Sequence, residues 1–173
     1  MAGKVIGKNL PYGFRGNVSR TPDTIITSFM NTGDEHIQFG EPVVFDPATG
    51  GVRKIKSTDT TNTNIVGIAV RHIGQPYADN EQGWYYGNGD MVDVLVRGSI
   101  CIELASATGI AAKGSVFVYN GSKGDIAGHA AGGIAASADS TNSDTVQIPN
   151  AIFTIGKADA NSIAEITILT RSI

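Results

Sequence analysis

The chain has 173 residues and a net charge of −3, and 22 of its residues are glycine, a share well above the usual value of about 7%. No run of about 18 apolar residues exists to form a membrane-spanning helix, and the single cysteine excludes an internal disulfide. Without such a run, a membrane is not an expected partner. Proteins that bind nucleic acids in general are normally basic, so a nucleic acid is not an expected partner either.

Residues 1–23 are predicted to form an extended basic arm. Met1–Pro22 contains no acidic residue, whereas all 16 acidic residues lie further along the chain. A solvated, disordered terminus is one interpretation, but spaced apolar side chains are unusual in such a tail. The arm is therefore predicted to become ordered on an acidic partner surface. The residues expected to contact that partner are Lys4, Ile6, Lys8, Leu10, Tyr12, Phe14, Arg15 and Arg20.

The remaining residues, 24–173, read as a series of short strands. Thr24–Met30 is rich in β-branched residues. Pro42–Ile55 is predicted to be a hairpin, because Asp46–Gly51 places Pro and Gly where a turn needs them. Ile65–Ile73 follows as a strand that is apolar on both faces at first, which favours a central position in a sheet.

The longest predicted strand is Met91–Leu104, with Gly98 as the expected position of a bulge or bend. Three further strands are predicted at Ser115–Tyr119, Ala151–Ala158 and Ile163–Ile173, with Asp159–Ser162 as the loop of the last hairpin. No segment shows a long amphipathic helical pattern. Short strands at intervals of about ten residues indicate an all-β fold, a small barrel or sandwich.

The segment Gly128–Asn142 consists mainly of small residues. It is consistent with an exposed loop or with a loosely packed pair of strands. The pattern assigns it no role.

The sequence predicts no catalytic residue, no cofactor and no metal. His36, His72 and His129 lie far apart and lack the spacing of a metal site. Cys101 lies in an apolar strand, so a buried, unreactive thiol is expected. Because no catalytic role can be filled, the chain is not expected to be an enzyme.

Trp84, Tyr85 and Tyr86 form an aromatic cluster outside the obvious strands. One interpretation is a loop that caps the barrel. Another is an interface anchor, because Trp and Tyr supply large contact areas at low entropic cost. A third is a platform for a sugar, with acidic and amide side chains nearby in Asp79–Gln82.

Three motifs recur along the predicted strands: Gly67-Ile68-Ala69, then Tyr86, Gly89-Asp90, Val94 and Gly98, and then Gly114–Tyr119. They resemble motifs of the capsid cement, or head decoration, proteins of tailed bacteriophages. That family commonly has a Gly-apolar-Ala strand, a long strand opened by Tyr and Gly-Asp, and a strand ending in Val-Tyr. The resemblance extends over about Thr24–Arg171.

The resemblance implies a small β-barrel or β-tulip body that binds the outside of an expanded phage head. Such proteins usually form trimers that clamp neighbouring capsomers of the major capsid protein against the pressure of packaged DNA. The expected location is the outer surface of the virion, after synthesis in the bacterial host cytoplasm, and the arm would lie across the shell or a neighbouring copy. The alternative is a carbohydrate- or receptor-binding β module of a phage tail or adhesin, with Trp84–Tyr86 as its platform.

Overall fold

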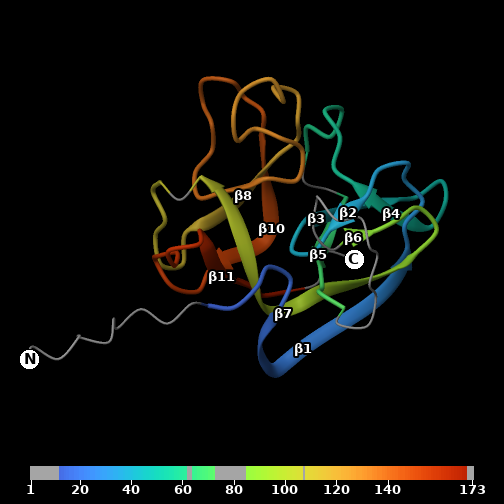
Figure 1. The fold of residues 1–173 in the computed structure, drawn as a ribbon, viewed down its shortest axis with the longest axis horizontal. Helices are drawn as coiled ribbons and strands as arrows, with labels where there is room; N and C mark the ends of the chain where they lie inside the picture. The colour runs from blue at the N-terminus through green and yellow to red at the C-terminus, as the bar shows by residue number, and fades with distance from the viewer. Residues whose placement is uncertain (1–11, 62–63, 73–84, 107, 171–173) are drawn as a thin grey trace, which may run out of the picture.

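The computed structural model describes residues 12–61, 64–72, 85–106 and 108–170 (Figure 1). These residues contain strands and no helix, which confirms the predicted all-β class, and accordingly no helix among them could cross a membrane. The strands are β1 (Val18–Met30), β2 (Ile37–Gln38), β3 (Pro42–Asp46), β4 (Gly51–Lys54), β5 (Ile65–Ala69), β6 (Tyr85–Tyr86), β7 (Met91–Ser106), β8 (Ser115–Tyr119), β9 (Ile134–Ala135), β10 (Thr145–Phe153) and β11 (Ile163–Ile168).

Five of these strands close into a barrel. The sheet runs in the order β11, β10, β8, β9 and β7, and β11 then pairs with β7 from Ile163↔Glu103 to Ile168↔Gly98. Closure leaves no free edge among the five strands. The interior is filled by fully buried aliphatic and aromatic side chains, among them Ile100, Ile102, Val118, Ile148, Phe153 and Ile166.

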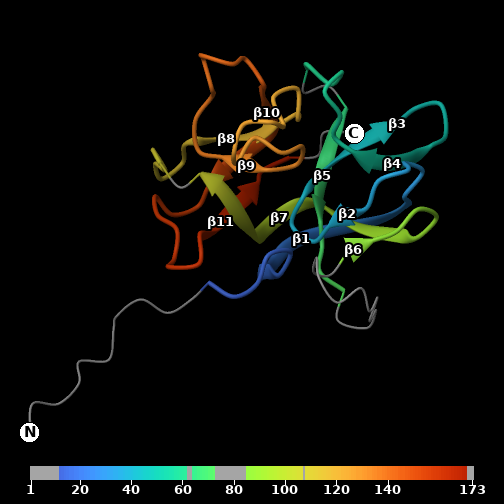
Figure 2. The same ribbon diagram turned by 45° about the horizontal axis from the view of Figure 1, so that its top comes forward.

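The first half of β7 belongs to a second lobe. There β7 pairs with β1 on one side and with β5 on the other, and β3 and β4 extend the sheet beyond β5. Figure 2 shows β3, β4 and β5 on one side of β7 and the barrel strands on the other. An isolated bridge from Asn31 to Val52 brings the end of β1 to β4. The long strand β7 is therefore shared by the two lobes.

Gly98 marks the point at which β7 changes partners. Its φ is +120°, a value that residues with a side chain rarely adopt. Opposite it, the pairing of β1 jumps from Arg20↔Ser99 to Ile25↔Arg97, so β1 bulges outward. A Cβ at position 98 would lie 3.1 Å from Oγ1 of Thr24, which is part of that bulge. The predicted irregularity at Gly98 is confirmed.

Other predicted elements also appear. The hairpin over Pro42–Ile55 is formed by β3 and β4, and β5 lies between β3 and β7, as its apolar pattern indicated. β1 begins at Val18 instead of Thr24, so the boundary drawn between arm and body falls inside a strand. Within the small-residue segment Gly128–Asn142 lies β9, which pairs with β7 and β8 and completes the barrel.

Candidate functional site

The described part of the predicted arm lies against the barrel. Gly16 N donates to Cys101 O at 2.8 Å, and Cys101 N donates back to Asn17 O at 2.9 Å. Gly16 O also accepts from Arg71 N at 2.8 Å. The φ of Gly16 is +80°, and a Cβ there would lie 2.9 Å from both Arg71 N and Phe39 Cβ. Only glycine permits so close a backbone approach, so this residue fixes the path of the segment Tyr12–Arg20.

Carboxylates of the body hold the same segment through its side chains and backbone. Glu165 on β11 accepts from Ser19 Oγ at 2.6 Å, from Arg20 Nε at 2.9 Å and from Arg20 Nη2 at 3.1 Å. Such bidentate contacts with arginine are among the strongest hydrogen bonds in proteins. The Glu165 side chain is only 6% exposed, whereas that of Arg20 is 57% exposed.

Two weaker anchors complete the attachment. Tyr12 N donates to Asp159 Oδ2 at 3.0 Å. Arg15 Nη1 lies 3.2 Å from Glu103 Oε2 in an exposed ion pair. Together with Glu165, these contacts tie the segment to β7, to β11 and to the loop before β11.

Two of the carboxylates that hold the segment, Glu165 and Asp159, have lowered pKa values. Burial alone would raise the pKa of Glu165, but hydrogen bonds from Arg20 and Ser19 outweigh it and hold that pKa below its ordinary value. Burial would likewise raise the pKa of Asp159, but the N–H groups of Ile163, Tyr12 and Asn161 lower it. Glu165 and Asp159 are therefore ionised at neutral pH and accept their hydrogen bonds as charged groups.

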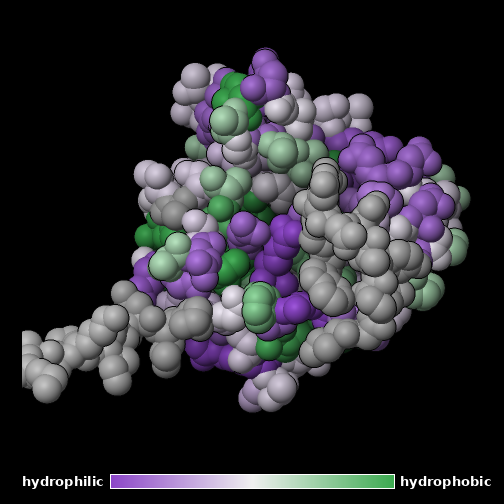
Figure 3. All heavy atoms as spheres, in the orientation of Figure 1, coloured by the Kyte–Doolittle hydropathy of each residue, from purple (hydrophilic) through white to green (hydrophobic). Residues whose placement is uncertain are grey.

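Phe14 projects from this segment and is 66% exposed. The guanidinium carbon of Arg71 lies 4.4 Å from the centre of its ring, in a cation–π contact. Beside it is a surface cavity of about 450 Å³, lined in part by Phe14, Arg15, Arg71 and Glu103. On the face drawn in Figure 3, hydrophobic residues are scattered among hydrophilic ones. Phe14 is the most exposed of the large hydrophobic residues that the structure describes.

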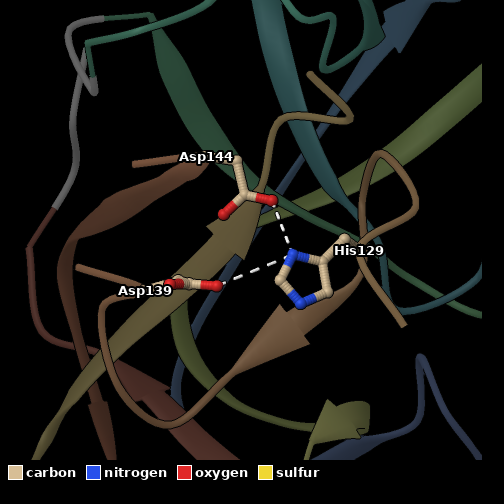
Figure 4. Close-up of side chains that lie close together, drawn as sticks. All are labelled: His129, Asp139 and Asp144. Carbon is tan, nitrogen blue, oxygen red and sulfur yellow. Dashed lines mark hydrogen bonds and ion pairs between the residues drawn. The ribbon is translucent and has the colours of Figure 1, made fainter. Parts of the chain in front are cut away.

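A second cluster of chemical groups lies in the connection between β8 and β10 (Figure 4). His129 Nδ1 lies 2.6 Å from Asp144 Oδ2 and 3.7 Å from Asp139 Oδ2. The search for regular histidine spacings missed this group, because its members lie ten and five residues apart and meet only through the fold. Two aspartates close to β10, in a segment otherwise made of small residues, are the signal that the sequence offered.

Cys101 has no features of a reactive thiol. It is 2% exposed, and its Sγ lies 3.2 Å from Tyr12 O. Burial, followed by the charges of Glu165 and Asp159, raises its pKa to about 11. A thiol with that pKa is protonated at neutral pH and is a weak nucleophile.

Comparison with known proteins identifies the family. A family model described as structural cement protein (E217 gp24/Pam3 gp6) matches residues 3–169. The chain belongs to this family of phage structural cement proteins. No curated protein matches the sequence. The fold is similar to that of a chain in the capsid of Myoviridae phage XM1, with a TM-score of 0.69 and 16% sequence identity over 98% of both chains.

Membership confirms the resemblance seen in the sequence motifs. The cement protein is a structural component of the phage capsid and belongs to the virion. Proteins of this family are not normally enzymes.

The predicted contact residues of the cement protein lie in three places: on the docked segment, outside the described residues, and, for Tyr85 and Tyr86, at the β2–β6 sheet. Tyr12, Phe14, Arg15 and Arg20 lie together on the docked segment. Outside the described residues lie Lys4, Ile6, Lys8, Leu10 and Trp84.

The other two aromatic residues of the predicted cluster lie at the small β2–β6 sheet. The Tyr85 ring stacks on His36 with centroids 4.1 Å apart. Tyr86 is 1% exposed, and its hydroxyl donates to Val70 O at 2.6 Å. The Tyr86 ring also meets Phe39 edge-on at 5.2 Å, so Tyr86 is part of the core of the second lobe.

Proposed function

We propose that this cement protein binds the outer surface of an expanded phage head and clamps neighbouring capsomers against the pressure of the packaged DNA. Family membership supports a place on the capsid. The observation that carries the finer proposal is the docking of Tyr12–Arg20 on the barrel, which fixes the position of Tyr12, the residue that follows the first eleven residues of the arm in the sequence.

The arm supplies the contact with the shell in this proposal. Lys4 and Lys8 suit an acidic surface, and Phe14, six residues after Lys8, is an exposed apolar anchor. An exposed ionic contact contributes about 0–1 kcal/mol, whereas burying a Phe side chain contributes about 1.5–3 kcal/mol. The apolar residues of the arm therefore carry more of the binding than its charges.

Arg15 and Arg20 have a different role in this proposal. Both cations are paired with carboxylates of their own body. They position the segment, and through it the arm, and do not themselves have to touch the shell. Three copies acting together would raise the effective concentration of each arm near its site, which favours a homotrimer.

The proposal is tested by sedimenting the protein with expanded shells that lack it. The full chain is expected to bind saturably, with a number of copies that matches the threefold positions of the shell. A chain lacking residues 2–11 retains Ser19 and Arg20, and so retains every contact of Glu165 that anchors the segment. That chain and Phe14→Ala should each raise the apparent Kd tenfold or more while the melting temperature of the free protein is unchanged.

The matched control is Leu169→Ala, because Leu169 is another exposed hydrophobic residue, 49% accessible, outside the arm. It should bind as the native protein does. If the shortened chain bound with native affinity, the arm would not be the contact. If the full chain failed to sediment with the shells at micromolar concentration, the whole proposal would be wrong.

A further inference from the structure

His129, Asp139 and Asp144 converge in the connection that runs from β8 to β10. His129 and Asp139 lie in the β8–β10 connection, and Asp144 immediately precedes β10. One ligand atom from each lies within 4.8 Å of the other two. Figure 4 shows the imidazole and the two carboxylates directed toward a common space.

Asp144 points to a ligand in that space. Its side chain is fully buried, and Oδ2 contacts His129 Nδ1 at 2.6 Å. Its other oxygen, Oδ1, is buried and has no hydrogen-bond partner among the described residues. A buried carboxylate normally has its oxygens paired or bound to a metal, because removing its charge from water is costly. A cation between the three side chains would supply the partner that Asp144 needs.

The other two groups are already held in position. The His129 ring packs against Tyr119 with centroids 4.3 Å apart, and its backbone N–H donates to Ile126 O. Asp139 accepts hydrogen bonds from the side chain and N–H of Asn142 and from the N–H of Thr141. These bonds fix the orientation of the Asp139 carboxylate.

The donor set selects the kind of ion. Calcium and magnesium prefer sites made only of oxygen atoms, whereas one imidazole nitrogen with two carboxylate oxygens suits zinc and its neighbours among the transition metals. Ligands about 2.0–2.2 Å from a tetrahedral zinc ion lie about 3.3–3.6 Å apart. The separations from His129 Nδ1, 2.6 Å and 3.7 Å, fall on either side of that range.

We propose that His129, Asp139 and Asp144 bind one divalent transition-metal ion, with zinc preferred. His129 would bind through Nδ1 and carry its proton on Nε2, and the two carboxylates would balance the charge of the ion. The side chains of His129 and Asp139 are 13% and 19% exposed, which gives the ion a route from solvent and leaves its fourth position to water.

The site would fasten the connection that completes the barrel. β9 lies between His129 and Asp139 and pairs with both β7 and β8. The ion would tie both ends of this segment to the start of β10. This inference is independent of how the protein meets the capsid.

The experiment is a zinc titration of the full chain after removal of metals with EDTA, by calorimetry and thermal denaturation. We expect one zinc ion per chain. Free zinc at one hundred times its Kd should raise the folding equilibrium constant about 100-fold. Magnesium and calcium should produce neither signal, and cobalt in place of zinc should give the visible absorption of a tetrahedral site.

The variants are chosen so that folding does not obscure the result. His129→Gln and Asp139→Asn alter partly exposed groups, and each should weaken zinc binding tenfold or more. His72→Gln is the matched control, because His72 also faces an aspartate, Asp93 at 3.9 Å, but has no third ligand among the residues that the structure describes. It should bind zinc as the native chain does.

Three outcomes would overturn the proposal. One is the absence of saturable zinc binding at one equivalent. Another is zinc binding that His129→Gln leaves unchanged, which would indicate adventitious surface binding. The third is equal binding of magnesium or calcium. In the first two cases the three residues would be an ion-paired structural cluster without a metal, and in the third the site would not be one selective for a transition metal.

Discussion

Glu165 and Asp144 are both buried carboxylates of the barrel, but they differ in the number of hydrogen bonds that they accept. Glu165 on β11 is 5% exposed and receives three hydrogen bonds from Ser19 and Arg20. Asp144, the residue just before β10, is fully buried, yet only one of its oxygens has a partner among the described residues. The more deeply buried carboxylate is thus the less well satisfied.

The difference shows how the role of a buried charge can be inferred from the groups that pair with it. The partners of Glu165 come from the N-terminal segment, so its charge holds two distant parts of the same chain together. The partner of Asp144, His129, contacts one oxygen and leaves the other without a partner among the residues that the structure describes. Glu165 is therefore an internal anchor, and Asp144 is the group on which a ligand proposal can rest.

The largest effect is expected from Glu165→Gln. The variant loses the charge, and its amide NH₂, itself a donor, would face donors of Ser19 or Arg20 from which the carboxylate accepted hydrogen bonds. Hydrogen bonds to charged groups contribute about 1.5–3 kcal/mol, so the free energy of unfolding should fall by about 2 kcal/mol in urea denaturation.

Glu103→Gln is the matched control for this change. Glu103 pairs with Arg15 on the same segment, but its side chain is 50% exposed. Exposed ion pairs contribute little, so its effect should stay within about 0.5 kcal/mol. Equal losses in the two variants would show that burial of Glu165 does not set the strength of the anchor.

The rate at which the Cys101 thiol is labelled measures how often the docked segment opens. Its thiol lies beneath the docked segment, with Sγ 3.2 Å from Tyr12 O. The segment must open before a reagent reaches the sulfur, so Glu165→Gln should speed labelling by iodoacetamide about tenfold, the factor that corresponds to about 1.4 kcal/mol. Labelling at the native rate would mean that the segment opens independently of Glu165.

A smaller effect is expected from Asp144→Asn in the presence of EDTA. The amide keeps an oxygen that can accept from His129, and it removes a buried charge whose second oxygen has no partner among the described residues. The free energy of unfolding should change by about 1 kcal/mol or less, clearly less than in Glu165→Gln. A larger loss than at Glu165 would show that the charge of Asp144 already serves an internal purpose.

Local sequence chemistry was sufficient to predict much of the fold. The hairpin of β3 and β4 follows from its turn residues, with Gly50 at φ +71°. The long strand β7 follows from its β-branched residues, and the change of partners at Gly98 follows from a glycine in a strand. Each of these features depends on residues that are close in sequence.

The features that were missed depend on distant partners. β9 has only two residues, and they form a strand because β7 and β8 flank them. Val18–Asp23 reads as the end of an arm until its pairing with β7 is known. Likewise, the Tyr86 side chain becomes part of the core because β6 pairs with β2. The convergence of His129, Asp139 and Asp144 has the same origin.

The smallest effect concerns the acid stability of the Glu165 anchor. Because Arg20 and Ser19 hold the folded pKa of Glu165 below its ordinary value of 4.5, the folded state binds fewer protons than the unfolded state. The stabilisation is complete above that ordinary value and is lost as the pH falls through the folded pKa. The free energy of unfolding should therefore fall between about pH 5 and pH 3, and less steeply in Glu165→Gln.

Some slope should remain in that variant, because the pKa values of Asp59 and Asp159 are also lowered and those groups are unchanged. Urea denaturation at a series of pH values, with EDTA present, measures both slopes. Identical slopes would mean that the Arg20 contact does not favour the ionised form of Glu165.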